Sequence, residues 1–197
     1  MKVIGITGTI GSGKSTLASF LHEFGAVVID ADKVGHEVYL PGTEGWQKVV
    51  AAFGRGILSS DGRIDRKKLG AIVFNDKAER DRLNHIVHPL IIRHIEDMLK
   101  KYRRQGVSLV AIEAALLIEA GWGKKVDEVW VTRAPQEVIL KRLAAKRKLT
   151  RAQALARIRS QLPVREQIKH ATRVIDASGS LAELKARVDL LWQKLNK

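Results

Sequence analysis

The sequence predicts an α/β fold with a parallel sheet at its core. Short runs of β-branched and aliphatic residues alternate with stretches whose apolar residues recur at helical spacing. A glycine-rich loop separates the first of these runs from the helix that follows it. With 197 residues, of which 45% are hydrophobic, the chain is large enough for one domain with a buried core.

The start of the chain carries the clearest pattern. Residues 3–7 form a β-branched run that ends at a glycine, which is typical of a buried strand. Residues 15–24 carry apolar side chains at helical spacing, and Gly25 closes this helix. Residues 26–29 form a second apolar run. The order strand, loop, helix, strand is typical of a parallel α/β sheet.

A change of pattern marks the middle of the chain. Residues 33–105 are charged and helix-periodic, so we expect a helical lobe set between strands, with a helix break at His88–Pro89. Other breaks are expected at residues 41–42, 54–56 and 61–62. Further strands are predicted at residues 108–113, 126–132 and 173–176.

Two capping boxes predict the starts of later helices. Thr150 and Gln153 form one box within a very basic helical stretch, residues 141–159, and Ser180 and Glu183 open the last helix. The predicted organisation is a single domain, residues 1–197, with a core at about 1–32, 106–141 and 171–197, a helical lobe at about 33–105 and a basic helical lid at about 142–170.

Charge and composition narrow the partners. The chain has 35 Lys and Arg against 21 Asp and Glu, a formal net charge of +14, which indicates nucleic acid, an acidic membrane or substrates with several phosphates. Only 5% of residues are aromatic, and no stretch alternates Phe or Tyr with basic residues as a base-stacking surface does. Nucleic acid is therefore only a secondary candidate for the partner of this chain.

Cysteine is absent, which excludes disulfides and thiolate chemistry and is compatible with a reducing compartment. The apolar run after Lys2 is broken by glycines too soon for a signal peptide or a membrane span. We therefore expect a cytoplasmic protein without a membrane partner, and leave its oligomeric state open.

The strongest motif is the loop that reads G-x-x-x-x-G-K-S, with a predicted strand before it and a helix after it. Glycines allow successive backbone N–H groups to point at one anion, and the helix adds its positive N-terminal dipole. We expect Lys14 to reach the β- and γ-phosphates of ATP as a catalytic residue, and the Ser15 hydroxyl to bind Mg²⁺. The predicted ATP-binding residues of this loop are Gly8, Gly11, Ser12, Gly13, Lys14, Ser15 and Thr16.

Carboxylates follow the predicted strands. Asp30 and Asp32 come at the end of the second strand, at the edge where open parallel sheets bind ligands. Asp30 is equally suited to cap the helix that starts next to it. Glu113 ends the third predicted strand, where it can hold Mg²⁺ or its water, whereas Glu119 is more typical of a solvated surface residue.

Histidines and basic residues are less specific. His85 and His88 lack a third ligand and the H-E-x-x-H pattern is absent, so we reject zinc. His88 is either a turn residue or a substrate contact. The basic helical stretch suits a solvated face, a nucleic-acid surface or a lid over a nucleotide, and we expect most of its cations to be solvated.

With these residues in place, the chain resembles the dephospho-coenzyme A kinase family over nearly its whole length. The most specific part is the loop at residues 8–16 followed by Asp-Ala-Asp at residues 30–32. Similar blocks follow in the same order at residues 83–84 with 88–91, 116–117 with 119, 136–142, 157–161, and 174–176 with 178–179.

The resemblance implies a P-loop kinase fold of the nucleotide-kinase type, with a helical acceptor-binding lobe and a mobile lid. The implied reaction moves the γ-phosphate of ATP, with Mg²⁺, to the ribose 3′-hydroxyl of dephospho-coenzyme A, the last step of coenzyme A biosynthesis. By the same resemblance Asp32 is the catalytic base, His88 and Leu116 contact the acceptor, and Arg142 contacts ATP.

Three positions depart from the family pattern. Residues 113–115 read Glu-Ala-Ala, where many members carry a proline before the Leu-Leu pair. The lid arginine of the family aligns with Lys146, with Arg147 one place later, so the catalytic lid cation is one of these two. A family aspartate before the last strand is replaced around Thr172–Arg173, which leaves the nucleotide contacts there open.

Three alternative functions share features with this sequence. A kinase for another small acceptor, such as a nucleoside, a nucleotide or shikimate, shares the loop, and only the Asp-Ala-Asp and His88–Pro89 blocks argue against it. A GTP-dependent switch is disfavoured because the sequence has no Asn-Lys-x-Asp segment. A nucleic-acid-binding ATPase is suggested by the net charge of +14 alone.

Overall fold

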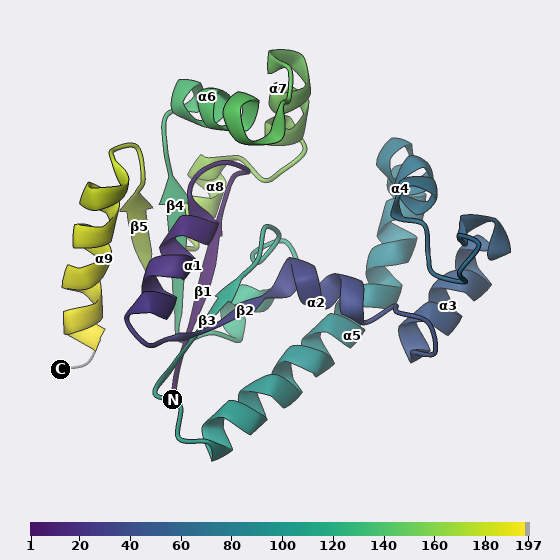
Figure 1. Cartoon of the computed structure of the whole chain (residues 1–197), viewed down its shortest axis with the longest axis horizontal. Coiled ribbons are helices and arrows are strands. Elements are labelled where there is room, and N and C mark those ends of the chain that lie inside the picture. The colour runs from purple at the N-terminus through teal and green to yellow at the C-terminus, as the bar shows by residue number, and fades with distance from the viewer. Residues whose placement is uncertain (196–197) are drawn as a thin grey trace. The chain divides into compact units, whose positions relative to one another are not determined.

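A computed structural model describes residues 1–195 and confirms the α/β class (Figure 1). The strands are β1 (Lys2–Gly8), β2 (Val27–Asp30), β3 (Leu109–Glu113), β4 (Glu128–Arg133) and β5 (Arg173–Asp176). The α-helices are α1 (Lys14–Glu23), α2 (Ala31–Glu37), α3 (Glu44–Phe53), α4 (Arg66–Asn75), α5 (Lys77–Arg104), α6 (Gln136–Arg147), α7 (Arg151–Arg159), α8 (Val164–Lys169) and α9 (Leu181–Leu195). Two short 3-10 helices are η1 (Arg55–Ile57) and η2 (Trp122–Lys124).

The strands of residues 1–195 form one parallel sheet in the order β2-β3-β1-β4-β5. β1 therefore lies between β3 and β4. Ile6 of β1 is in register with Glu113 of β3, and Gly8 is in register with Thr132 of β4. Ligands bind at the carboxyl ends of strands in such sheets, so the loop after β1 lies at the binding edge, between the ends of its two neighbours.

Packing on one face of the sheet seats the helix that follows this loop. Ile4, Ile6 and Trp130 of the sheet form a buried cluster with Leu17 and Leu21 of α1, and all five side chains are 0% exposed. α9 lies beside α1 on the same cluster (Figure 1). Burial of each large apolar side chain contributes about 1.5–3 kcal/mol, so α1 is firmly held against the strands.

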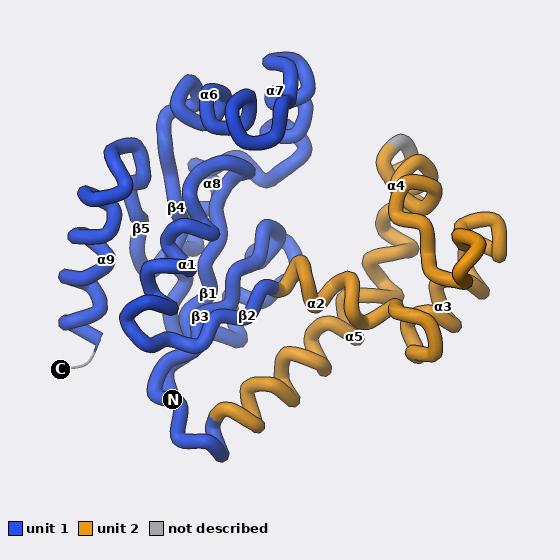
Figure 2. The backbone as a smooth tube through the Cα atoms, in the orientation of Figure 1, with its two compact units in different colours: residues 1–30, 103–197 blue, residues 31–102 orange. Residues whose placement is uncertain are grey.

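The chain divides into two compact units (Figure 2). The first, residues 1–30 with 103–197, contains the sheet, and the second, residues 31–102, is helical. The second unit has a core of its own, formed by Val49, Ile57, Ile64, Leu69 and Val87. The assignment of residues 33–105 to the acceptor and of residues 142–170 to a lid stays a prediction.

The predicted helix break at His88–Pro89 is wrong. α5 runs without interruption through Pro89. A proline inside a helix removes one backbone hydrogen bond and costs about 3 kcal/mol or more. Val87, Leu90 and Ile95 are buried on both sides of the proline, and their tertiary packing outweighs that local cost.

Both predicted capping boxes are confirmed. The Thr150 and Gln153 side chains exchange hydrogen bonds with each other's backbone at the start of α7, and Ser180 and Glu183 do the same before α9. The basic stretch is two helices, because α6 ends at Arg147 and is followed by Lys148, whose φ of 51° is left-handed. Within the described range, none of the helices combines the length and the apolar character that crossing a membrane requires.

Candidate active site

The glycine loop turns sharply between β1 and α1. Gly8 has a φ of 146° and Gly13 a φ of 108°, both in the region that favours glycine. A Cβ on Gly8 would lie 2.5 Å from the carbonyl oxygen of Thr132, a distance at which something must move. Gly11 lies between them, also at a positive φ of 78°. The backbone thus curls as an anion cradle does, with β4 too close for a side chain at Gly8.

The first turn of α1 is suited to an anion. It begins at Lys14 and continues through Ser15 and Thr16, with no acidic residue among them. Its N-cap is Gly13, which has no side chain to bond the first N–H groups. These N–H groups therefore point out of the end of the helix that faces the loop. The positive end of the helix dipole lies at the same end.

Lys14 is held against the loop by its own backbone. Its Nζ donates to the carbonyl oxygen of Gly8 at 2.9 Å and to that of Thr9 at 3.2 Å. The ammonium group therefore sits beside the cradle, where it can contact the terminal phosphates of a nucleotide bound there.

Ser15 and Glu113, the two predicted metal ligands, lie next to each other. The Ser15 Oγ donates to the Glu113 Oε1 at 2.6 Å. Asp30 of β2 is in register with Glu113 at the same edge of the sheet. A hydroxyl and a carboxylate are the hard oxygen donors that Mg²⁺ prefers, and Mg²⁺ usually keeps several waters, so this pair fits a hydrated Mg²⁺ next to the phosphates.

Thr132 is a loop contact that the sequence analysis missed. Its Oγ1 donates to the Thr7 carbonyl oxygen at 3.2 Å and lies 2.6 Å from the Ser12 Oγ, so the Ser12 hydroxyl donates to it. Both Ser12 and Thr132 are 0% exposed. The only signal in the sequence was a polar residue at the end of an apolar strand. Thr132 therefore holds the loop against the end of β4 through the Ser12 hydroxyl.

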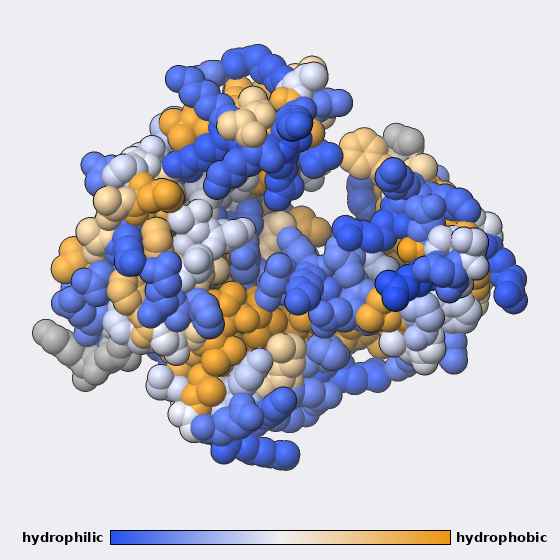
Figure 3. Space-filling view, in the orientation of Figure 1, coloured by the Kyte–Doolittle hydropathy of each residue, from blue (hydrophilic) through white to orange (hydrophobic). Residues whose placement is uncertain are grey.

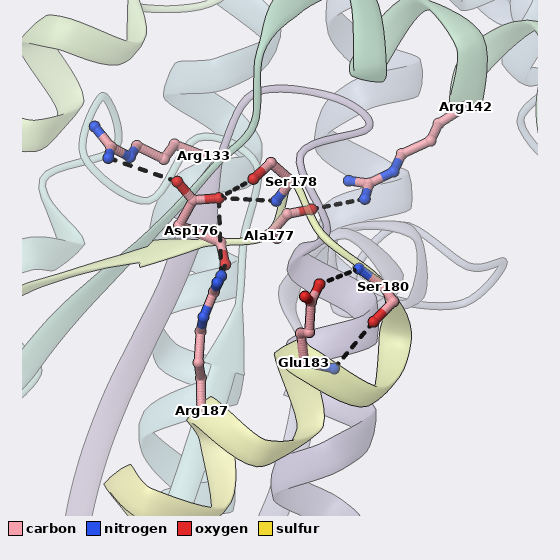
Figure 4. Close-up of polar contacts among 8 residues, drawn as sticks. All are labelled: Arg133, Arg142, Asp176, Ala177, Ser178, Ser180, Glu183 and Arg187. Carbon is pink, nitrogen blue, oxygen red and sulfur yellow. Dashed lines mark hydrogen bonds and ion pairs between the residues drawn. The ribbon is translucent and has the colours of Figure 1, made fainter.

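The turn between β5 and α9, which falls in a block of the family resemblance, makes contacts that the sequence did not predict (Figure 4). The Asp176 carboxylate accepts hydrogen bonds from the backbone N–H and the hydroxyl of Ser178, and it also pairs with Arg133 and Arg187. The Ser178 hydrogen bonds, followed by the two guanidinium charges, hold the pKa of Asp176 below its ordinary value. The turn therefore has a fixed shape at neutral pH.

The same turn forms a hydrogen bond with Arg142. The Arg142 Nη2 donates to the carbonyl oxygen of Ala177 at 2.6 Å (Figure 4). A Cβ built on Gly13 would lie 3.0 Å from the Ala177 Cβ and 3.9 Å from the Arg142 Nη1. The structure thus brings Arg142 and the Ala177 turn next to the last glycine of the loop.

Lys146 and Arg147 are placed differently. Both are exposed in the last turn of α6, and neither side chain forms an ion pair within residues 1–195. Hydrophilic residues cover much of the visible surface of α6 and α7 (Figure 3). Among residues 1–195, no hydrogen bond or ion pair joins either predicted lid cation to the loop, and their role stays a prediction.

The predicted acceptor-side residues lie as follows. Asp30 ends β2, and Asp32 lies in the first turn of α2, exposed to solvent. Leu116 is 41% exposed, while its neighbour Leu117 is fully buried, so only Leu116 is available to a ligand.

His88 lies in the middle of α5 and is half-buried. Burial lowers the pKa of its imidazole, and the charge of His85 lowers it further. The ring is therefore neutral at pH 7, able to donate one hydrogen bond and accept another.

These features define a P-loop nucleotide-binding protein: a glycine loop after the central strand of a parallel sheet, a lysine beside it, and a serine–carboxylate pair. A family model described as dephospho-CoA kinase matches residues 2–183. The dephospho-CoA kinase of Geobacter sulfurreducens is 46% identical over 194 residues, which are 98% of both chains. The chain belongs to the dephospho-CoA kinase family, whose members are ATP-dependent phosphotransferases.

Solved structures agree with this assignment. A protein from Thermus thermophilus superposes with a TM-score of 0.85 at 34% identity, covering 98% of this chain and 97% of the other. The dephospho-CoA kinase of Campylobacter jejuni superposes with a TM-score of 0.74 at 29% identity, covering 99% and 98%.

Proposed function

We propose that the chain transfers the γ-phosphate of ATP to the ribose 3′-hydroxyl of dephospho-coenzyme A, which yields ADP and coenzyme A. The observation that carries this proposal is the match to the family over residues 2–183. The loop geometry supports phosphoryl transfer as the reaction, and the family match supports the acceptor. We propose a cytoplasmic location as well, with which the absence of cysteine is compatible.

The loop and its neighbours bind ATP in this proposal. Backbone N–H groups of the loop and of the first turn of α1 hold the β- and γ-phosphates, and Lys14 neutralises the charge that grows on them. Arg142, anchored on the Ala177 carbonyl beside Gly13, contacts the nucleotide.

Ser15 and Glu113 hold Mg²⁺ in this proposal, since the pair already lies within a hydrogen bond. Mg²⁺ bound there would offset negative charge on the β- and γ-phosphates. Ser15 keeps its hydroxyl at the first turn of α1, and Glu113 supplies the charge from the end of β3.

Asp32 accepts the proton of the acceptor 3′-hydroxyl as the new O–P bond forms and the bond between the γ-phosphorus and the β-phosphate oxygen breaks. ADP leaves with the electrons of that bond. A positioned carboxylate typically contributes about 10²–10⁴-fold to such a step. His88, neutral at pH 7, and the exposed Leu116 contact the acceptor. Lys146 or Arg147 stabilises transferred charge when the lid closes.

A coupled ADP-release assay on the purified chain tests the proposal. ATP and Mg²⁺ are supplied with dephospho-coenzyme A, a set of nucleosides, or shikimate. We expect the highest kcat/KM with dephospho-coenzyme A, with coenzyme A identified as the product by mass. A Lys14→Ala preparation made in parallel controls for contaminating kinases. A higher kcat/KM with any other acceptor contradicts the proposal.

A further inference from the structure

The segment that joins α7 to α8 is held by hydrogen bonds to Ile10, Glu119 and Gln167, which belong to the same compact unit. The Gln161 Oε1 accepts the backbone N–H of Ile10 at 2.7 Å. The Leu162 N–H donates to the Glu119 Oε1 at 3.2 Å, and the Leu162 carbonyl oxygen accepts from the Gln167 Nε2 at 2.7 Å. Gln167 is only 1% exposed, so the α8 end of this joint is anchored in the protein interior, and Gln161 contacts the loop from the α7 end.

The partner of Gln161 lies inside the phosphate loop. Ile10 packs its side chain against the apolar cluster of α6 and α7, which contains Ile139, Leu143 and Ala154. Its N–H belongs to the same peptide group as the carbonyl of Thr9. That carbonyl accepts from the Lys14 Nζ at 3.2 Å.

One peptide plane therefore joins Gln161 to Lys14. Peptide groups are planar and trans, so the N–H and C=O of the Thr9–Ile10 peptide point in opposite directions. When Gln161 accepts the N–H on one side, the carbonyl is directed to the other side, where the Lys14 ammonium lies. A peptide flip would break both hydrogen bonds.

We propose that Gln161 is a positioning residue for the phosphate loop. By holding the Thr9–Ile10 peptide it keeps the Thr9 carbonyl oriented toward Lys14, and so keeps the lysine beside the cradle before ATP binds. The inference rests on the proposed use of this loop for ATP. It assigns a role to Gln161, which lies 151 positions from Ile10 along the chain. Gln161 acts through Lys14 and does not contact the reacting atoms.

A purely structural role for Gln161 predicts other effects of its substitution than a positioning role does. If Gln161 only tethers the joint between α7 and α8, its loss lowers the melting temperature and leaves ATP affinity unchanged. If it positions the loop, its loss weakens ATP binding and exposes the Ile10 amide to exchange with solvent. The two roles are separable by measuring both quantities.

The experiment compares Gln161→Met with Gln153→Met. Methionine has a similar length but no amide oxygen. Gln153 is a matched control, because it accepts the Thr150 N–H at 3.0 Å in the α7 capping box and forms no hydrogen bond to the loop within the described part of the chain. The dissociation constant of ATP-Mg²⁺ is measured by titration calorimetry without acceptor, so the result is independent of which acceptor the enzyme uses.

We expect Gln161→Met to weaken ATP binding by about 2- to 12-fold, the factor that one hydrogen bond is typically worth, and to accelerate exchange of the Ile10 amide. Gln153→Met is expected to lower the melting temperature with ATP affinity unchanged. Gln161→Glu keeps an oxygen at the same reach and is expected to retain protection of the Ile10 amide. Unchanged ATP affinity in Gln161→Met, equal losses in both methionine variants, or an unprotected Ile10 amide in Gln161→Glu overturns the proposal.

Discussion

Glu128 offers the sharpest test of how the sheet is held together. It begins β4 and is 8% exposed, at the end of the sheet opposite the phosphate loop. Its Oε1 lies 2.6 Å from the Lys2 Nζ, and its Oε2 accepts from the Arg173 Nε at 2.8 Å and from the Trp130 Nε1 at 2.7 Å. One carboxylate thus joins the beginnings of β1, β4 and β5. Glu128→Gln removes the charge of this carboxylate and keeps the size of the side chain.

The expected size follows from the pKa of this carboxyl. Burial raises the pKa of Glu128, but hydrogen bonds from Arg173, Lys2 and Trp130 lower it more, from an ordinary 4.5 to about 2. Each pH unit between these values is worth about 1.36 kcal/mol, so the ionised group contributes roughly 3 kcal/mol to the free energy of unfolding at pH 7. Because the folded pKa is the lower one, this contribution is complete above about pH 4.5 and is lost as the pH falls toward 2.

Urea unfolding of both proteins between pH 3 and pH 7 measures the contribution. We expect Glu128→Gln to be less stable by roughly 3 kcal/mol at pH 7, with the difference reduced to about half or less at pH 3. Carboxylates elsewhere titrate in both proteins, so the difference reports on Glu128. A difference that stays constant with pH, or that is below about 1 kcal/mol at pH 7, refutes this account of the ion cluster.

Four further outcomes are expected. Lys14→Ala should lower kcat by at least about 10²–10³-fold with unchanged circular dichroism, because it removes a cation that stabilises transition-state charge; near-normal turnover would contradict the role of the loop. Asp32→Asn should lower kcat by about 10²–10⁴-fold while ATP still binds, and Asp30→Asn should not; the reverse order at saturating substrates assigns the base to Asp30. Thr132→Val should destabilise the protein by about 1–3 kcal/mol in urea unfolding and weaken ATP binding, because the buried Ser12 hydroxyl loses its acceptor; unchanged values would remove Thr132 from the loop. Amides 143–161 should gain protection from hydrogen exchange when an ATP analogue and the acceptor bind, and equal protection in both states would mean that the segment is not a lid; Lys146→Ala and Arg147→Ala kinetics then show which cation the reaction uses.

Much of the site was accessible from the sequence because its parts are local. The glycine loop, Lys14 and Ser15 follow one another in a single motif, and the strand before them is recognisable by composition. Glu113 was predictable for a different reason. Carboxyl ends of parallel strands meet at one edge, so a carboxylate that ends a strand next to β1 lies near the loop however distant it is along the chain.

The remaining contacts join residues that no local pattern connects. Thr132 meets Ser12 across 120 positions, and Gln161 meets Ile10 across 151. At Pro89 the local pattern gave a wrong prediction. Proline predicts a helix break, but tertiary packing of the flanking apolar residues keeps α5 continuous. Local patterns therefore predict the groups of the loop itself, while the residues that support those groups require the fold.

The two ends of β4 separate stability from function on one strand. Glu128, Trp130 and Thr132 alternate along it and so share a face, with Trp130 fully buried in the core between them. Glu128 acts at the amino end, away from the loop, whereas Thr132 acts at the carboxyl end, where it accepts the Ser12 hydroxyl. Substitutions at either end are expected to lower the free energy of unfolding by amounts of similar order. Only Thr132→Val should also weaken ATP binding under conditions where both proteins are folded. If Glu128→Gln weakens ATP binding as much, the loop responds to the stability of the whole sheet, and Thr132 has no separate part in shaping it.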